Sequence, residues 1–189
     1  MIKTMNDTKR DAILTAADLM AAAALTAPKG SGKDTIRTAI VTGEDKDRLR
    51  DKMLAMGEAT GQVLYTRDAG NVDNSVAVVL IGCTGNLFGM DQCGMCGFEN
   101  CAALKRSGGR CVFTVSDLGI AVGSAVSVAA DHRIDNRVMY SVGRAALKLS
   151  LLPDDAELCY GIPLSISSKS MYFDRGPGAV LTLDSEDKE

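Results

Sequence analysis

Four cysteines stand close together in the middle of the sequence, and they restrict the fold more than any other feature. These four loop cysteines are Cys93, Cys96, Cys101 and Cys111, separated by two, four and nine intervening residues. Thiolates bind soft or borderline metals, and a C-x2-C turn can supply two ligands to one metal. Four thiols at this spacing can supply every ligand of one metal centre. We therefore expect the segment that carries them to fold around a metal.

The spacing favours an iron–sulfur cluster over zinc. A structural zinc site usually has a second C-x2-C or histidine pair roughly twelve to twenty residues further on, whereas the only histidine here, His132, lies well away from the cysteines. Short C-x2-C spacings with a more remote cysteine are typical of [4Fe–4S] ligation. Gly94 and Gly97 would let backbone amides approach the sulfur atoms. We expect a [4Fe–4S] cluster on the four loop cysteines, with structural zinc and free thiols as alternatives.

Composition and charge limit the class of protein. The chain has 189 residues, 46% hydrophobic and 24% charged, which suits one domain over residues 1–189. Its net charge of −3 makes nucleic acids and anionic membranes unpromising partners. The longest apolar run, Val76–Gly82, is far shorter than the roughly 18 residues of a membrane span. The first residues lack the pattern of a secretory signal. We therefore expect a cytoplasmic protein with no membrane partner.

Hydrophobic periodicity predicts helices and strands on both sides of the cysteines. The expected helices cover residues 6–27, 42–61, 116–130 and 135–149, and the expected strands cover 35–41, 76–81 and 158–162. Ser116-Asp117 and Asp135-Asn136 are expected to cap the last two helices, and Pro163 to end the last strand. The sequence thus predicts one α+β domain in which residues 83–111 form an inserted Cys-rich loop. The small-residue helix 116–130 suits a central position or a subunit interface.

Two further cysteines and several cations are candidate site residues. Cys83 and Cys159 lie in or beside expected strands, where packing as small hydrophobic groups is the more common role. The cations Lys29, Lys33, Lys169 and Arg175 could hold a flavin or nucleotide phosphate, although a solvated surface position is the more common role for each. No Ser-His-Asp or Cys-His signature indicates hydrolase chemistry.

The segment from Cys93 to Ala103 resembles the C-G-x-C-G-x-x-x-C-A segment of an Fe–S domain found in electron-transfer and corrinoid-linked proteins of anaerobes. This resemblance implies that the four loop cysteines bind the cluster. The last interval, nine residues here, is commonly longer in that family. Cys83 is therefore a possible substitute for Cys111 as the fourth ligand.

The resemblance extends beyond the cysteines. Thr26–Gly30, Asp117–Ala121, Asp135–Tyr140 and Gly161–Leu164 resemble segments of a family of uncharacterised prokaryotic proteins described only as containing a ferredoxin domain. More distantly, the order of elements is similar to that of nitroreductases. That similarity implies a three-layer α+β homodimer with FMN at its interface, and Lys29, Lys169 and Arg175 would be candidates for the FMN phosphate. The nitroreductase arginine-serine-arginine pattern near the N-terminus is absent.

Three functions follow from these observations. In the first, one [4Fe–4S] cluster passes electrons to a redox partner protein or a small-molecule electron acceptor. In the second, an FMN-dependent, nitroreductase-like oxidoreductase receives its electrons from the cluster. In the third, a structural zinc stabilises the loop of a non-enzymatic binding module. Nothing in the sequence identifies a substrate.

Overall fold

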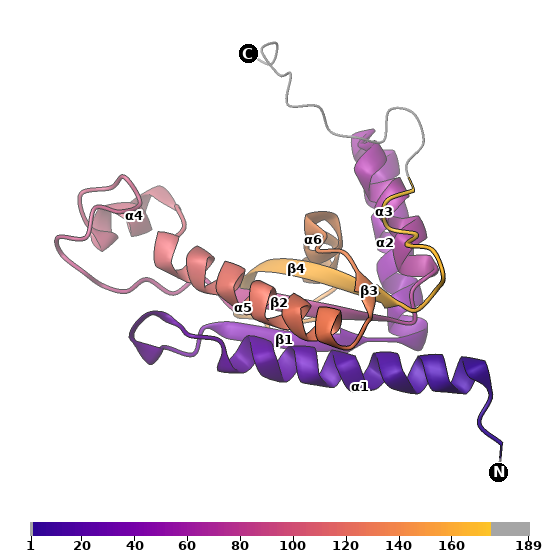
Figure 1. Ribbon diagram of the computed structural model, residues 1–189. Coiled ribbons are helices and arrows are strands. Elements are labelled where there is room, and N and C mark those ends of the chain that lie inside the picture. Colours follow the sequence, from indigo (N-terminus) through magenta and orange to yellow (C-terminus); the bar gives the residue numbers. More distant parts are fainter. Residues whose placement is uncertain (1, 175–189) are drawn as a thin grey trace.

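A sheet of four antiparallel strands lies between two layers of helices in the computed structural model, which describes residues 2–174 (Figure 1). The strands stand in the order β1 (Ile36–Val41), β2 (Ala77–Thr84), β4 (Ala156–Ser165) and β3 (Asp135–Asn136). The helices are α1 (Met5–Thr26), α2 (Gly43–Thr60), α3 (Val63–Asp73), α4 (Cys101–Ser107), α5 (Val112–Asp131) and α6 (Tyr140–Lys148), with a short 3-10 turn at Gly30–Gly32. This arrangement confirms the predicted three-layer α+β fold.

Strand β2 is the centre of the sheet because both of its faces are covered. All eight of its residues are buried, as the continuous apolar run predicted. Alternate side chains point to opposite faces of a strand. Accordingly, Val79 and Ile81 belong to the hydrophobic cluster beneath α1 and α5, while Val78 and Leu80 belong to the cluster beneath α2, α3 and α6. The molecule therefore has one hydrophobic layer on each side of the sheet.

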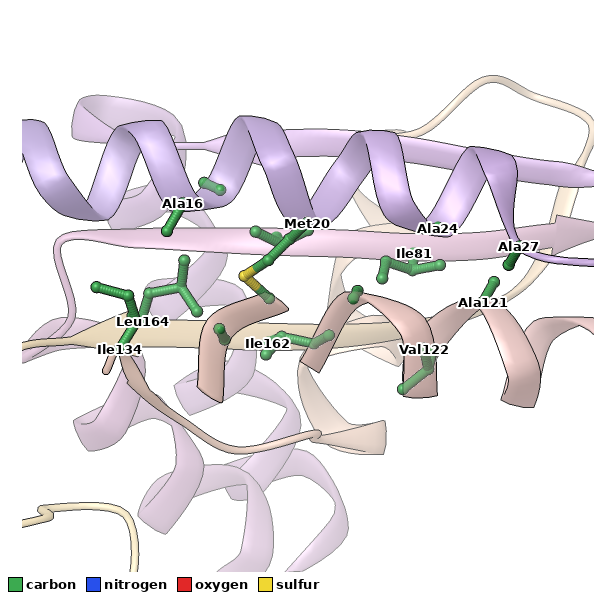
Figure 2. Packing of buried hydrophobic residues seen from close by; sticks show 14 of the residues in the cluster. Ala16, Met20, Ala24, Ala27, Ile81, Ala121, Val122, Ile134, Ile162 and Leu164 are labelled. Atoms are coloured by element: carbon green, nitrogen blue, oxygen red, sulfur yellow. The ribbon is translucent and has the colours of Figure 1, made fainter. Parts of the chain in front are cut away.

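Helices α1 and α5 pack side by side on one face of the sheet. Figure 2 shows Met20 and Ala24 of α1 and Ala121 of α5 on the sides of the two helices that face each other and the strands. The small side chains of Ala24 and Ala121 let the helix backbones approach one another, as the small-residue pattern predicted. Helix α1 begins with a capping box in which the Asp7 amide donates to Thr4 Oγ1 at 3.3 Å, and the Thr4 amide donates to Asp7 Oδ2 at 3.0 Å.

Within the described part of the chain, α5 alone is long and apolar enough to cross a membrane, judged by length and composition. A core helix of a soluble protein passes the same test. One face of α5, which includes Leu118 and Ala125, is fully buried against α1 and the sheet. The opposite face, which includes Ile120, is exposed.

Two predicted helix starts are wrong. Helix α5 begins at Val112 and not at Ser116, so Asp117 lies inside it, where the carboxylate accepts the Gly30 amide with both oxygens at 3.1 Å. Asp135 and Asn136 form β3 and not a helix cap, because they pair with the end of β4. Helix α6 consequently begins at Tyr140.

Pro163 does not end its strand, contrary to the prediction. Backbone groups two residues apart along a strand point to the same side. Gly161 exchanges both of its backbone hydrogen bonds with Met139, at 2.8 and 3.0 Å, and Leu164 accepts from Val76 on the β2 side. The nitrogen of Pro163 therefore points away from β2, so its missing N–H leaves the β2–β4 ladder intact.

Candidate metal centre

The Cys-rich loop connects the end of β2 to the start of α5 and projects beyond the end of the sheet (Figure 1). It covers residues 85–111, and it contains α4. Cys83, which was predicted to be the first residue of the loop, lies inside β2 and is fully buried in the cluster beneath α1 and α5. The loop is therefore joined at both ends to elements of the core.

Hydrogen bonds order the loop internally. Thr114 of α5 donates its hydroxyl to the carbonyl of Asn86 at 2.8 Å, and the Cys101 amide donates to the carbonyl of Met90 at 3.4 Å. Asn100 caps α4 by accepting the Ala103 amide at 2.9 Å. These bonds fix the start of the loop to α5 and place Cys101 at the first turn of a helix. Asn100 was not singled out from the sequence, although an Asn before a helical segment is a recognisable cap signal.

All four loop cysteines line one small cavity, which we call the sulfur cavity. Its other lining residues are mostly apolar: Met90, Gly94, Met95, Asn100, Leu104, Val112 and Phe113. Gly94 and Gly97 adopt positive φ values of 65° and 83°, which glycine accepts without strain. Three of the cysteines are half-buried, and Cys111 is buried. The loop thus brings together the four side chains that the spacing singled out.

The thiols share this cavity without forming a closed ligand shell. Among the described residues, no three side chains of the types His, Cys, Asp or Glu are positioned to hold a metal ion. The chemistry of the donor set nevertheless fits an iron–sulfur cluster, because four thiols face one mostly apolar space.

The thiol pKa of Cys111 is shifted in the opposite direction from those of Cys83 and Cys159, the two cysteines in strands. Burial acts to raise the pKa of Cys111, but hydrogen bonds from the backbone of Thr114, Phe113 and Phe88 outweigh it, so the pKa is lowered. Burial raises the pKa of Cys83 to about 11 and that of Cys159 to about 12. A metal ligand must be a thiolate. Because their pKa values are raised, Cys83 and Cys159 are held as neutral thiols, which do not bind a metal.

The predicted phosphate-binding cations do not gather at one place. Lys29 donates to the carbonyl of Ala27 at 2.9 Å and to that of Leu25, at the C-terminus of α1. Lys169 follows the C-terminal end of β4, at the end of the sheet away from Lys29, and its ammonium pairs with Asp174 at 2.9 Å. Lys33 lies 4.9 Å from the centre of the Phe88 ring. Arg175 lies outside the described residues.

A second, larger hollow adjoins the sulfur cavity and was not predicted. This cleft has a volume of about 580 Å³. Its lining residues are Gly85, Asn86, Leu87, Gly89, Cys101, Ala102, Lys105, Gly108, Gly109, Arg110 and Glu157. Arg110 and Glu157 form an ion pair at the cleft, and Cys101 lines both hollows. Basic residues on either side of Gly108-Gly109 were the signal in the sequence that could have indicated it.

Comparison with protein families finds a match over residues 107–175 to a family described as an uncharacterised protein containing a ferredoxin domain. That match includes Cys111 and begins after the other three loop cysteines. An uncharacterised protein from Archaeoglobus fulgidus is 42% identical over 185 residues, which cover 94% of this chain and 99% of that protein. The likeness to this relative therefore extends over nearly the whole chain.

Several solved structures with a similar fold are nitroreductases. The nitroreductase CinD from Lactococcus lactis, in complex with nicotinic acid, has a TM-score of 0.58 and 15% identity, covering 82% of this chain and 79% of its own. A nitroreductase with bound FMN from Desulfitobacterium hafniense has a TM-score of 0.57 and 15% identity, covering 82% and 78%. At this level of identity the likeness shows the fold alone.

Proposed function

The chain belongs to the family of uncharacterised proteins that contain a ferredoxin domain, and from this premise we propose that it is an iron–sulfur redox protein with one [4Fe–4S] cluster. The observation that carries the proposal is that Cys93, Cys96, Cys101 and Cys111 all line the sulfur cavity. When bound, such a cluster supplies one-electron transfer at a potential set by its hydrogen bonds and exposure.

Cys111 is the better candidate than Cys83 for the fourth ligand. Cys111 lines the sulfur cavity together with the other three loop cysteines. Cys83 is buried within β2, among the side chains beneath α1 and α5. Moving its sulfur into the loop would require the end of the central strand to unpair from Ile36 and Leu158.

The surroundings of the cavity suit a redox cluster that is partly shielded from water. Leu104, Val112 and Phe113 contribute apolar groups to its lining. The positive φ values of Gly94 and Gly97 turn the backbone on either side of Cys96, so that amide groups can approach its sulfur. Burial and amide hydrogen bonds are the means by which proteins set the potential of a cluster.

The outer surface of the loop supports exchange with a redox partner protein. Met95 and Phe98 lie between the cysteines, and 62% and 36% of their surfaces are exposed. Exposed apolar groups gathered at one place are typical of an interaction surface. We propose a cytoplasmic protein with such a partner or a small-molecule acceptor, and with neither nucleic acid nor membrane as a partner. We also propose that it forms a homodimer, for which the exposed face of α5 is the candidate surface.

A second candidate function is an FMN-dependent oxidoreductase that receives electrons from the cluster. The observation that favours it is the common fold with a nitroreductase that holds FMN. Against the predicted phosphate site stands the position of Lys29 and Lys169 at opposite ends of the sheet within one protomer.

Visible absorption of anaerobically purified protein tests the proposal. We expect a broad iron–sulfur absorption shoulder that bleaches with dithionite, together with about four iron and four sulfide per chain. Two resolved flavin bands would support the second function. A colourless protein that contains zinc would refute both functions and favour a structural metal.

Cysteine variants test the ligand assignment. Cys96→Ser and Cys111→Ser should lose the chromophore and most of the iron. Cys83→Ser is the matched control and should keep both, because its sulfur lies in the core of the sheet. If Cys83→Ser loses the chromophore while Cys111→Ser keeps it, the assignment of the fourth ligand is wrong.

A further inference from the structure

The cleft beside the sulfur cavity has the size and position of a small-molecule site. Its volume of about 580 Å³ lies within the roughly 300–1,000 Å³ common for ligand pockets. Three separate parts of the chain form its walls: the start of the loop at residues 85–89, helix α4 with the turn after it, and Glu157 at the start of β4. Residues 85–89 follow β2 directly and Glu157 lies in β4. Two of the three walls are therefore joined to the sheet.

The charged groups at the cleft favour an anionic ligand. Lys105 and Arg110 contribute cations, and Glu157 contributes a carboxylate that already pairs with Arg110. Lys105 has no ion-pair partner among the described carboxylates. The cleft therefore offers one cation whose charge is not neutralised by a neighbour.

Helix α4 connects this cation to the candidate cluster. Cys101 and Lys105 are four residues apart on the helix, so they lie on the same face, one turn apart. Cys101 lines the sulfur cavity and the cleft at once. A molecule held by Lys105 would therefore lie directly beside a cluster ligand.

Glycine residues keep the walls of the cleft open. A Cβ at residue 85 would lie 2.2 Å from the carboxyl carbon of Glu157, so any side chain here would displace that carboxylate. Gly89 and Gly108 have positive φ values and open space above their Cα atoms. The backbone itself therefore forms much of the wall, where peptide groups can approach a ligand closely.

We propose that this cleft binds a phosphate-bearing organic molecule of mononucleotide size, with its phosphate on Lys105 and its body toward Cys101. The molecule would be the small-molecule electron partner of the cluster, and this role rests on the proposed function above. The site differs from the predicted phosphate cations, because neither Lys29 nor Lys169 lines the cleft.

Titration of the anaerobic protein with FMN, followed by flavin fluorescence, tests the site. Lys105→Ala should raise the Kd for FMN by roughly tenfold, since a hydrogen bond to a charged group is lost. Arg106→Ala is the matched control, because Arg106 is the next cation on the same helix and does not line the cleft. It should change the Kd by less than about twofold. Riboflavin, which lacks the phosphate, should bind wild type and Lys105→Ala equally.

Three outcomes would overturn the phosphate site. No binding of FMN to wild type, or equal losses in Lys105→Ala and Arg106→Ala, would show that the cleft does not select a phosphate. A loss in Lys29→Ala or Lys169→Ala that Lys105→Ala does not share would place the phosphate elsewhere. Iron content and the dithionite-bleachable absorption are measured on the same samples. Loss of these signals with FMN binding intact would refute the cluster and leave the cleft standing.

Discussion

Replacing Gly143 with alanine tests how closely α6 packs on β4. A Cβ at this position would lie 1.8 Å from the carbonyl oxygen of Cys159 and 2.9 Å from the Cα of Tyr160. Both atoms belong to the backbone of a strand that pairs with β2 on its other side. They cannot swing aside as a flexible side chain would, so α6 must move outward by roughly 1.5–2 Å to restore ordinary contact.

Two opposing effects set the size of the change. Alanine is favoured over glycine in a helix interior by about 1 kcal/mol. Overpacking a core typically costs about 1–3 kcal/mol and sometimes more, and moving α6 would also loosen the buried contacts of Val142 and Ala146 beneath it. We therefore expect Gly143→Ala to lower the free energy of unfolding by about 2 kcal/mol. For a chain of this size, the Tm should fall by roughly 4–8 °C.

Urea unfolding of Gly143→Ala beside a matched variant gives the measurement. Gly70 also lies inside a helix, α3, but a Cβ there meets no atom within 4 Å. Gly70→Ala should therefore raise the free energy of unfolding by up to about 1 kcal/mol. If Gly143→Ala proves as stable as Gly70→Ala at an unchanged m-value, the reasoning is refuted, because the packing of α6 on β4 then leaves room for a methyl group.

Two further changes test other parts of the fold. Asp117→Ala removes the acceptor that holds the Gly30 amide, and it should lower the free energy of unfolding by about 1–3 kcal/mol. Exposed Asp18→Ala on α1 is its control, and equal urea midpoints would contradict the expectation. Burial raises the pKa values of Cys83 and Cys159 to about 11 and about 12, so above pH 9 the unfolded chain loses protons that the folded chain keeps. The contribution of these two thiols to stability should therefore be constant below pH 9 and fall from there toward pH 12, so that stability falls less steeply in Cys159→Ala, and an equally steep fall in that variant would contradict the cause.

The sequence predicted the elements whose patterns are strong and local. The apolar run before Cys83 indicated a strand buried on both faces, and β2 is that strand. The spacing of the four loop cysteines predicted one metal site; the four side chains line one cavity, and their binding of a metal stays a prediction. Helices α3 and α4 were not predicted, and α4 has only seven residues, within the segment that was expected to be an inserted loop. Tertiary contacts determine whether such a short segment becomes a helix, and the local sequence pattern does not reveal those contacts.

The errors around β4 have one physical cause. Asp135 and Asn136 look like a helix cap, but their pairing with the end of β4 depends on a strand nearly thirty residues later. Pro163 looks like a strand end, yet its nitrogen faces the sheet edge beside Met139, where no ladder bond is required. The side to which a proline nitrogen points is a property of the sheet and not of the local sequence.

The way the loop is held predicts what removal of the metal should do. Its ends are fixed by β2 and α5, and the hydrogen bond from Thr114 to Asn86 needs no metal. The four loop cysteines lie outside both hydrophobic clusters of the sheet. Chelation should therefore accelerate hydrogen exchange in α4 and leave the amides of β2 protected, because local opening does not require global unfolding. Loss of protection in β2 would instead mean that the metal stabilises the whole fold, as a structural zinc does.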